Sequence, residues 1–117
     1  MERRDKAGYR RRMELIAVIT TVADTAQADA LAGAAVEQGL AACVQAETVR
    51  STYRWKGETV AEPEVRLLFK TTRTRYAALE AWLRARHPYE LPAIFALPVA
   101  EASADYADWV RTAVDGV

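Results

Sequence analysis

The sequence predicts an α+β domain: a ferredoxin-like βαββαβ sandwich with an extra C-terminal helix. A β-branched apolar run at residues 15–22 reads as a buried strand and is followed by an alanine-rich helical segment at 25–38. Two long strand-like segments, 40–55 and 59–72, are joined by a short turn and form a hairpin. An amphipathic helix over 73–86 then precedes a strand over 93–99. Two βαβ halves that share a central hairpin define this sandwich, with helices on one face of an antiparallel sheet.

Local signals support the ends of the first helix. Asp24 is the expected N-cap, with Gln27 three residues later as its capping-box partner. Gly39 follows the last residues of the periodic segment, where a residue with positive φ commonly ends a helix. The helix is therefore expected between these two signals.

The hairpin has two notable features. Gly57 can adopt the positive φ that its turn requires, and Pro63 interrupts the second strand, which predicts an edge or a bulge and a bend at this point. Strands usually run about five or six residues, so segments this long exceed what a compact monomer uses. We expect them to pair with another copy of the chain, in a homo-oligomer.

The second half carries two further helices. Thr72 is the expected cap of the helix over 73–86, and Ser103 of a last helix. Apolar residues at helical spacing mark the buried face of each helix. In the helix over 73–86 they are Tyr76, Leu79 and Leu83. In the last helix they are Tyr106, Val110 and Val114, with Trp109 alongside.

Composition and charge limit the possible functions. The 117 residues suffice for one domain. The net charge is zero, but the charges are unevenly distributed along the chain. Residues 1–12 hold six basic and two acidic side chains, a net +4, which leaves −4 on 13–117. We interpret 1–12 as a basic, disordered leader and 13–117 as a single domain whose acidic balance argues against nucleic-acid binding.

Cellular location follows from two observations. No segment approaches the roughly 20 apolar residues of a membrane span. Cys43 is the only cysteine, so an intrachain disulfide cannot form, and a reducing cytoplasm is the expected compartment. Within its apolar strand, Cys43 is interpreted as a buried structural thiol rather than a nucleophile.

No enzyme signature is found. A GxSxG motif, a glycine-rich phosphate loop, CxxC and HExxH are all absent from the sequence. Glu62 and Glu64 would share one side of a strand, but beside Pro63 they are interpreted as a solvated edge. The chain is therefore expected not to be an enzyme and to use no organic cofactor.

His87 is the only histidine and lies where a helix must end, because Pro88 follows it. Imidazole is a common metal ligand, so His87 is the principal candidate ligand for a divalent cation. Glu64 and Glu90 are weaker candidates that could reach it through the fold or across a subunit contact. The alternative is a hydrogen-bonded histidine at a helix end.

Tyr53, Trp55 and Lys70 lie on the two arms of the predicted hairpin. An aromatic shelf with a nearby cation would suit a small anionic ligand. The alternative is aromatic packing at a subunit interface, where tyrosine and tryptophan are enriched.

Several blocks, in order and with matching spacing, give the chain a family resemblance over residues 15 to about 112. They are Leu40-Ala41-Ala42-Cys43-Val44, Ser51-x-Tyr53-x-Trp55-x-Gly57, Glu64, Leu68-x-Lys70-Thr71-Thr72, His87-Pro88-Tyr89-Glu90-Leu91-Pro92 and Tyr106-x-x-Trp109. On these blocks the chain resembles the CutA divalent-cation tolerance family.

The resemblance implies a homotrimer with an architecture similar to the PII signalling proteins, and a non-enzymatic role in the response to divalent metal ions such as Cu(II). It also implies a copper site formed by a first-strand cysteine and two adjacent histidines. Here Thr20 stands at the first position and Arg86 at the second, so only His87 is kept. Two other roles stay open: a PII-like trimer that binds small molecules, and a structural or assembly trimer with no metal role.

Overall fold

The computed structural model describes Gly8 and residues 13–116 of the chain. The predicted leader lies outside the described residues, Gly8 excepted, so the domain boundary at residue 13 stays a prediction. The elements are β1 (Leu15–Val22), α2 (Thr25–Glu37), β2 (Cys43–Trp55), β3 (Glu58–Thr72), α3 (Tyr76–Arg86), β4 (Phe95–Pro98) and α4 (Ala104–Asp115). This order confirms the predicted βαββαβ arrangement with a C-terminal helix.

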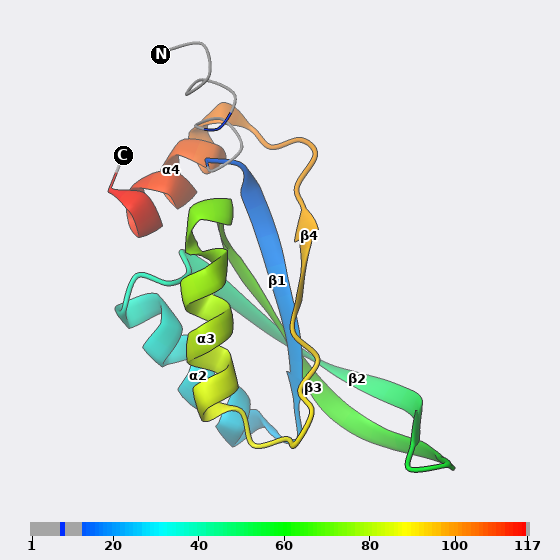
Figure 1. Cartoon of the computed structure of the whole chain (residues 1–117). Helices are drawn as coiled ribbons and strands as arrows, with labels where there is room; N and C mark the ends of the chain where they lie inside the picture. The colour runs from blue at the N-terminus through cyan, green and yellow to red at the C-terminus, as the bar shows by residue number, and fades with distance from the viewer. Residues whose placement is uncertain (1–7, 9–12, 117) are drawn as a thin grey trace.

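The four described strands form one antiparallel sheet in the order β2-β3-β1-β4. Helices α2 and α3 cover one face of this sheet (Figure 1). The core between the layers is built from side chains such as Val18, Phe69 and Leu83, all fully buried. Helix α4 packs at one end of the sheet, where Leu15, Ala107 and Val110 form a smaller cluster.

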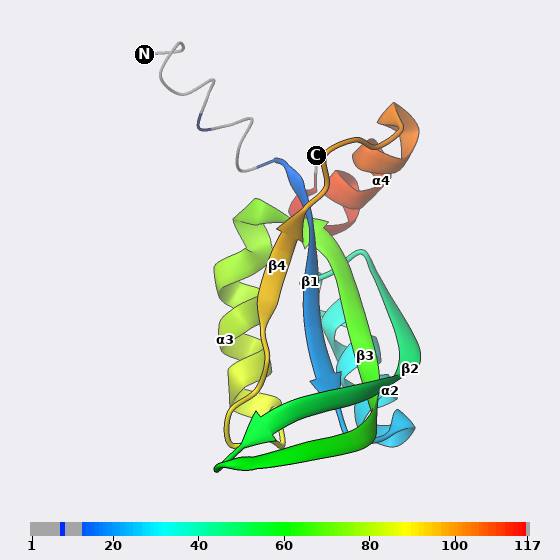
Figure 2. The same ribbon diagram turned by 90° about the vertical axis from the view of Figure 1, so that its right-hand side faces the viewer.

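The hairpin of β2 and β3 extends well beyond its neighbour. Strand β1 pairs with β3 only from Val65 to Thr72, whereas β2 continues to pair with β3 as far as Trp55 and Glu58. We call the projecting part, residues 49–64, the hairpin arm. The arm bends across the end of the sheet (Figure 2), and the molecule measures 53 × 27 × 26 Å.

The turn at the tip confirms and extends the prediction. Gly57 has φ of 83° as expected, and Lys56 has φ of 50° as well. Two consecutive positive φ values are typical of a type I′ turn, whose twist matches that of the strands it joins. Pro63 lies in the arm, where β3 has left β1, and its pairing with Arg50 continues without a bulge. An edge position, not a bulge, is therefore how the proline is accommodated.

Some predicted boundaries and faces are wrong. The second strand begins at Cys43 instead of residue 40, because Gly39 ends α2 with φ of 73° and Leu40 donates its N–H back to Ala35. The fourth strand is shorter than 93–99. Tyr106 is 37% exposed, and Ala107 takes its place in the buried row of α4.

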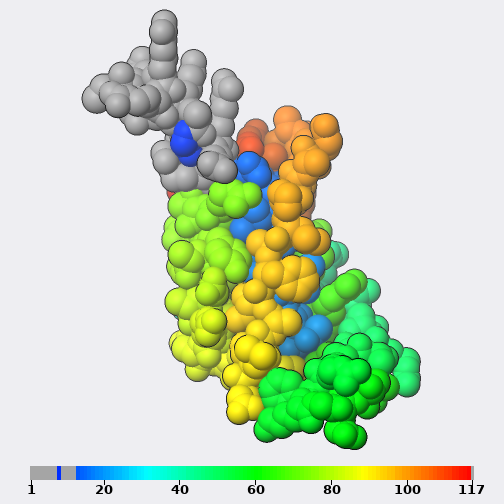
Figure 3. Space-filling view, turned by 45° about the vertical axis from the view of Figure 1, so that its right-hand side comes forward, coloured from blue at the N-terminus to red at the C-terminus, as the bar shows by residue number. Residues whose placement is uncertain are grey.

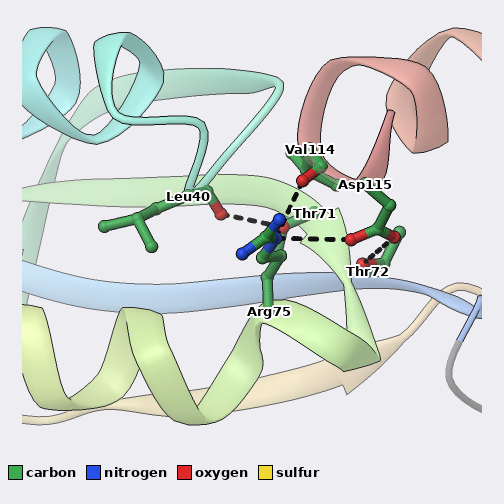
Figure 4. Close-up of polar contacts among 6 residues, drawn as sticks. All are labelled: Leu40, Thr71, Thr72, Arg75, Val114 and Asp115. Carbon is green, nitrogen blue, oxygen red and sulfur yellow. Dashed lines mark hydrogen bonds and ion pairs between the residues drawn. The ribbon is translucent and has the colours of Figure 1, made fainter. Parts of the chain in front are cut away.

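Thr72 does not cap the next helix with its side chain. A 3₁₀ turn, Arg73–Arg75, comes between β3 and α3. The Thr72 hydroxyl instead donates to Asp115 Oδ2 at 2.8 Å, and Arg75 Nε donates to the Val114 carbonyl at 2.8 Å (Figure 4). These bonds tie the end of α4 to the end of β3.

Candidate functional site

A pocket of about 850 Å³ lies between the hairpin arm and the segment that leads into β4. We call it the arm pocket. Its lining consists of Thr21, residues 51–55, Glu62, Glu64, residues 88–91 and Ala93. Figure 3 shows this end of the molecule, with the arm in green beside the yellow segment. Volumes between about 300 and 1,000 Å³ are typical of small-molecule sites.

Strand geometry explains why polar and aromatic side chains meet here. Alternate residues of a strand share a face, so Glu62 and Glu64 point to one side of β3. Ser51 lies directly opposite Glu62 on β2, and Tyr53 lies two residues further along the same face. The bend of the arm then brings this face against the segment after α3.

Two phenol–carboxylate pairs organise the pocket. Tyr89 donates its hydroxyl proton to Glu64 Oε2 at 2.7 Å, and Tyr53 donates to Glu62 Oε1. Burial and then the bond to Glu64 raise the pKa of Tyr89, while the bond to Glu62 is the main cause that raises the pKa of Tyr53 to about 12. Both phenols thus remain protonated donors at neutral pH.

The expectation that Glu64 belongs to a solvated edge is wrong. Only 6% of this residue is exposed, whereas Glu62 is half-buried. Among the described residues, the one hydrogen bond to this carboxylate comes from Tyr89, and Glu64 Oε1 is not one of the buried atoms left without a partner, which are Trp82 Nε1 and Asp115 Oδ1. The sequence could not indicate this burial, since it depends on how the arm bends over Tyr89.

His87 ends α3 and uses both of its ring nitrogens. The backbone N–H of Tyr89 donates to Nδ1 at 3.1 Å, so the proton of the neutral ring is on Nε2. That nitrogen lies 3.0 Å from the Thr21 carbonyl oxygen and 3.0 Å from Thr20 Oγ1. Burial lowers the pKa of His87, although the Thr21 bond and the Glu64 charge act in the opposite direction. This geometry matches the alternative of a hydrogen-bonded histidine at a helix end.

The structure brings Thr20 and His87 together, 67 residues apart in the chain. These residues nevertheless do not fit a copper site of thiolate and imidazole ligands: Thr20 offers a hydroxyl, Arg86 a cation, and His87 has no free nitrogen. Arg86 instead lies over the Trp82 ring at 4.7 Å. Within residues 13–116, no three His, Cys, Asp or Glu side chains gather closely enough to hold a metal ion.

The other predicted residues are divided between two regions. Tyr53 and Trp55 line the arm pocket, but Lys70 does not. Lys70 pairs with Cys43 at the opposite end of the hairpin, and its Nζ lies 5.6 Å from the Tyr106 ring. The predicted shelf of aromatic side chains beside Lys70 is therefore wrong.

Glu90 and Lys56 face each other at the pocket mouth with 4.0 Å between Oε2 and Nζ, and both side chains are 72% exposed.

The sequence did not indicate that Thr21, Thr52 and Arg54 line the arm pocket, because contacts between the arm and distant segments leave no local signal. Cys43, expected to be buried, is half-buried.

The fold agrees with what comparison with known proteins shows. Residues 16–113 match the model of the family described as CutA1 divalent ion tolerance protein. The CutA divalent-cation tolerance protein of Thermus thermophilus is 44% identical over 95 residues, which cover 80% of this chain and 92% of that protein. The chain therefore belongs to the CutA family.

Solved structures of relatives show the same fold. CutA from Synechococcus elongatus matches with a TM-score of 0.84 at 42% identity, covering 87% of this chain and 91% of that one. A protein from Archaeoglobus fulgidus, called a periplasmic divalent cation tolerance protein CutA, matches with a TM-score of 0.83 at 27% identity, covering 86% and 98%. The family carries the name of a tolerance function, not of an enzyme.

Proposed function

We propose that this chain acts in the tolerance of divalent cations as a non-enzymatic oligomer, and that its cation contact is the arm pocket. The observation that carries the proposal is Glu64, a carboxylate in the lining of this pocket that is only 6% exposed and has no basic partner among the described ion pairs, its hydrogen bond coming from the neutral phenol of Tyr89. Glu62 faces the same pocket, and Glu90 stands at its mouth. Buried carboxylates need a compensating cation or donor, and a divalent ion supplies that charge.

The proposed ligands favour particular ions. Carboxylate and hydroxyl oxygens suit hard cations such as Mn²⁺ and Mg²⁺, whereas Cu(II) prefers imidazole. His87 is the second candidate ligand. One of its ring nitrogens would have to give up its hydrogen bond with the Tyr89 N–H or the Thr21 carbonyl before it could bind a metal ion. One chain provides too few ligands for a closed site, so water or a neighbouring subunit completes the coordination in this proposal.

The proposed assembly is a homotrimer. Ile94 and Ala96 pack toward the helices, so Phe95 and Leu97, which alternate with them, face the opposite side of the sheet. These two residues are 47% and 50% exposed. Together with the projecting arm, the uncovered apolar side chains support pairing with further copies, in the PII-like arrangement implied by the family resemblance.

The proposed compartment is the cytoplasm. The single cysteine of the sequence cannot form an intrachain disulfide. Among the described helices, none has the length and apolarity needed to cross a membrane. Cell fractionation with an antibody against the native protein tests this assignment, and recovery in the periplasm would overturn it.

The tolerance function is tested in cells sensitised to divalent cations. Expression of the chain should restore growth at raised concentrations of Cu(II) or Mn(II), and expression of a Glu64→Gln variant at the same level should restore less. Equal rescue by both proteins would remove the arm pocket from the function. No rescue by either would refute the proposed role in tolerance.

A further inference from the structure

We propose that α4 is a detachable lid, which opens as one unit from the end of the sheet while the main core stays folded. Figures 1 and 2 show α4 at the end of the molecule opposite the hairpin arm. Through its N-cap Ser103 and through Tyr106, α4 forms one wall of a second pocket of about 410 Å³. Opening of the lid removes this wall. The second pocket shares no lining residue with the arm pocket, so the inference does not depend on the proposed cation contact.

The first step of the argument is that α4 packs on a small apolar cluster of its own. Leu15, Ala107 and Val110 form this cluster, which is distinct from the core between the sheet and the helices α2 and α3. The largest side chains of α4, Tyr106 and Trp109, are instead 37% and 51% exposed. Small buried side chains remove little apolar surface from water. A unit with few buried apolar contacts opens at a lower free energy than the whole molecule.

The second step is the way α4 is connected to the rest of the chain. Residues 99–103, between β4 and α4, form neither helix nor strand. Strand β4 pairs with β1 from Phe95 to Pro98, so this pairing ends before the connection begins. Arg111 Nε donates to the Met13 carbonyl at 3.0 Å, and this acceptor precedes the first residue of β1. The helix can therefore leave without breaking any strand pairing of the sheet.

The third step is an incomplete clamp at the C-terminal end of α4. Asp115 Oδ2 accepts the Thr72 hydroxyl, and Arg75 Nε donates to the Val114 carbonyl (Figure 4). Asp115 Oδ1 lies 3.3 Å from Arg75 Nε, yet it is a buried atom without a hydrogen bond. A buried oxygen that lacks a donor is costly, and opening returns this oxygen to water. The clamp thus holds the lid closed less firmly than a fully paired one.

Hydrogen exchange of the full chain under native conditions tests the lid. A released helix of 12 residues is marginal in water, so the amides of α4 exchange whenever the lid opens. We expect the central amides of α4 to be protected at least about tenfold less than the slowest amides of β1. Their exchange should depend little on low denaturant concentrations, because opening exposes little surface. Protection equal to that of β1 would mean that α4 opens only by global unfolding, which overturns the proposal.

Two variants separate opening of the lid from global unfolding. Leu83→Val weakens the main core, where Leu83 is fully buried, so exchange in β1 should accelerate while exchange in α4 stays unchanged. Thr72→Val removes the donor to Asp115 and should accelerate exchange in α4 at least about fivefold. Thr59→Val, at an exposed position of β3, is the matched control and should not.

Thermal unfolding checks that each variant is folded, and Leu83→Met replaces the valine variant if that one is not. Equal acceleration of exchange in α4 and β1 by the Leu83 variant would overturn the proposal. Exchange in α4 that Thr72→Val leaves unchanged would also overturn it, because the clamp would then not hold the lid.

Discussion

Tyr89 and Glu64 join two parts of the chain that are 25 residues apart, through a 2.7 Å hydrogen bond from the phenol to the carboxylate. Tyr89 belongs to the segment after α3, and Glu64 marks the base of the hairpin arm. His87 holds the same segment to the end of β1 through the Thr21 carbonyl. The bent arm, the helix end and the central strand are thus connected around one pocket.

Replacing Tyr89 by phenylalanine should destabilise the protein by about 1–3 kcal/mol, because the buried carboxylate of Glu64 loses its donor. Chemical denaturation measures the change. Tyr53→Phe is the matched control: it removes the same group from Glu62, but Tyr53 is 38% exposed, so water replaces the bond and the loss should be smaller. Equal effects would show that the burial of Glu64 does not matter.

The stability of the protein should decrease as the pH falls below about 6.5, the ordinary pKa of histidine. Burial lowers the pKa of His87 in the folded chain, so the unfolded chain takes up the proton first and is favoured as pH falls. Above about pH 6.5 this contribution is fully present. His87 is the only histidine, so denaturation at pH values between about 7.5 and 5.5 isolates it.

A His87→Gln variant is the control for this pH dependence. Glutamine keeps a donor and an acceptor but does not titrate in this range. Its stability should vary less with pH over the same interval. A slope equal to that of the natural chain would mean that other groups cause the effect.

The bonds between β3 and α4 should contribute measurably to stability. Asp115 has a side chain 9% exposed, accepts the Thr72 hydroxyl and lies 3.3 Å from Arg75 Nε. Thr72→Val keeps the shape but removes the donor, and should cost about 1–3 kcal/mol in the free energy of unfolding. Thr59→Val, at an exposed position of β3, should change it by less than about 0.5 kcal/mol.

Assembly should depend on the face that bears Phe95 and Leu97. Sedimentation should give three times the 13.0 kDa chain mass, with a melting temperature that rises with protein concentration. Leu97→Asp should shift the protein toward monomers, because a charge would be buried at the contact. Val36→Asp, at a residue 43% exposed on α2, is the matched control. A monomeric natural chain would contradict the proposed trimer.

Local patterns in the sequence were enough to predict most of the fold. The limits of β1, the Asp24 cap and the positive φ of Gly57 all depend on near neighbours in the chain, and each is confirmed. In the observed cap, Gln27 accepts the N–H of Ala23, one residue before the expected partner. The prediction that Thr72 caps the next helix is wrong because its hydroxyl has a tertiary partner, Asp115, 43 residues away.

The site was harder to predict, because it depends on register and on the bend of the arm. Tyr53 and Lys70 are on paired strands, but the register sets them against Val60 and Cys43 respectively. The two-residue turn at Lys56 and Gly57 fixes this register, so the separation of Tyr53 from Lys70 follows from the predicted turn. The bend of the arm has no such local signal. The contact between Thr20 and His87 was implied by family resemblance alone and is present.

The central claim is that the arm pocket, and not a free imidazole, binds the cation. The most direct measurement is a calorimetric titration of Mn(II) and of Cu(II) into the purified, tag-free protein and into Glu64→Gln, His87→Gln and Glu58→Gln variants. We expect Glu64→Gln to weaken binding by at least about tenfold, as losses in metal sites commonly do, while Glu58→Gln and His87→Gln leave it nearly unchanged. Binding that is lost in His87→Gln and kept in Glu64→Gln would contradict the account and make His87 the ligand.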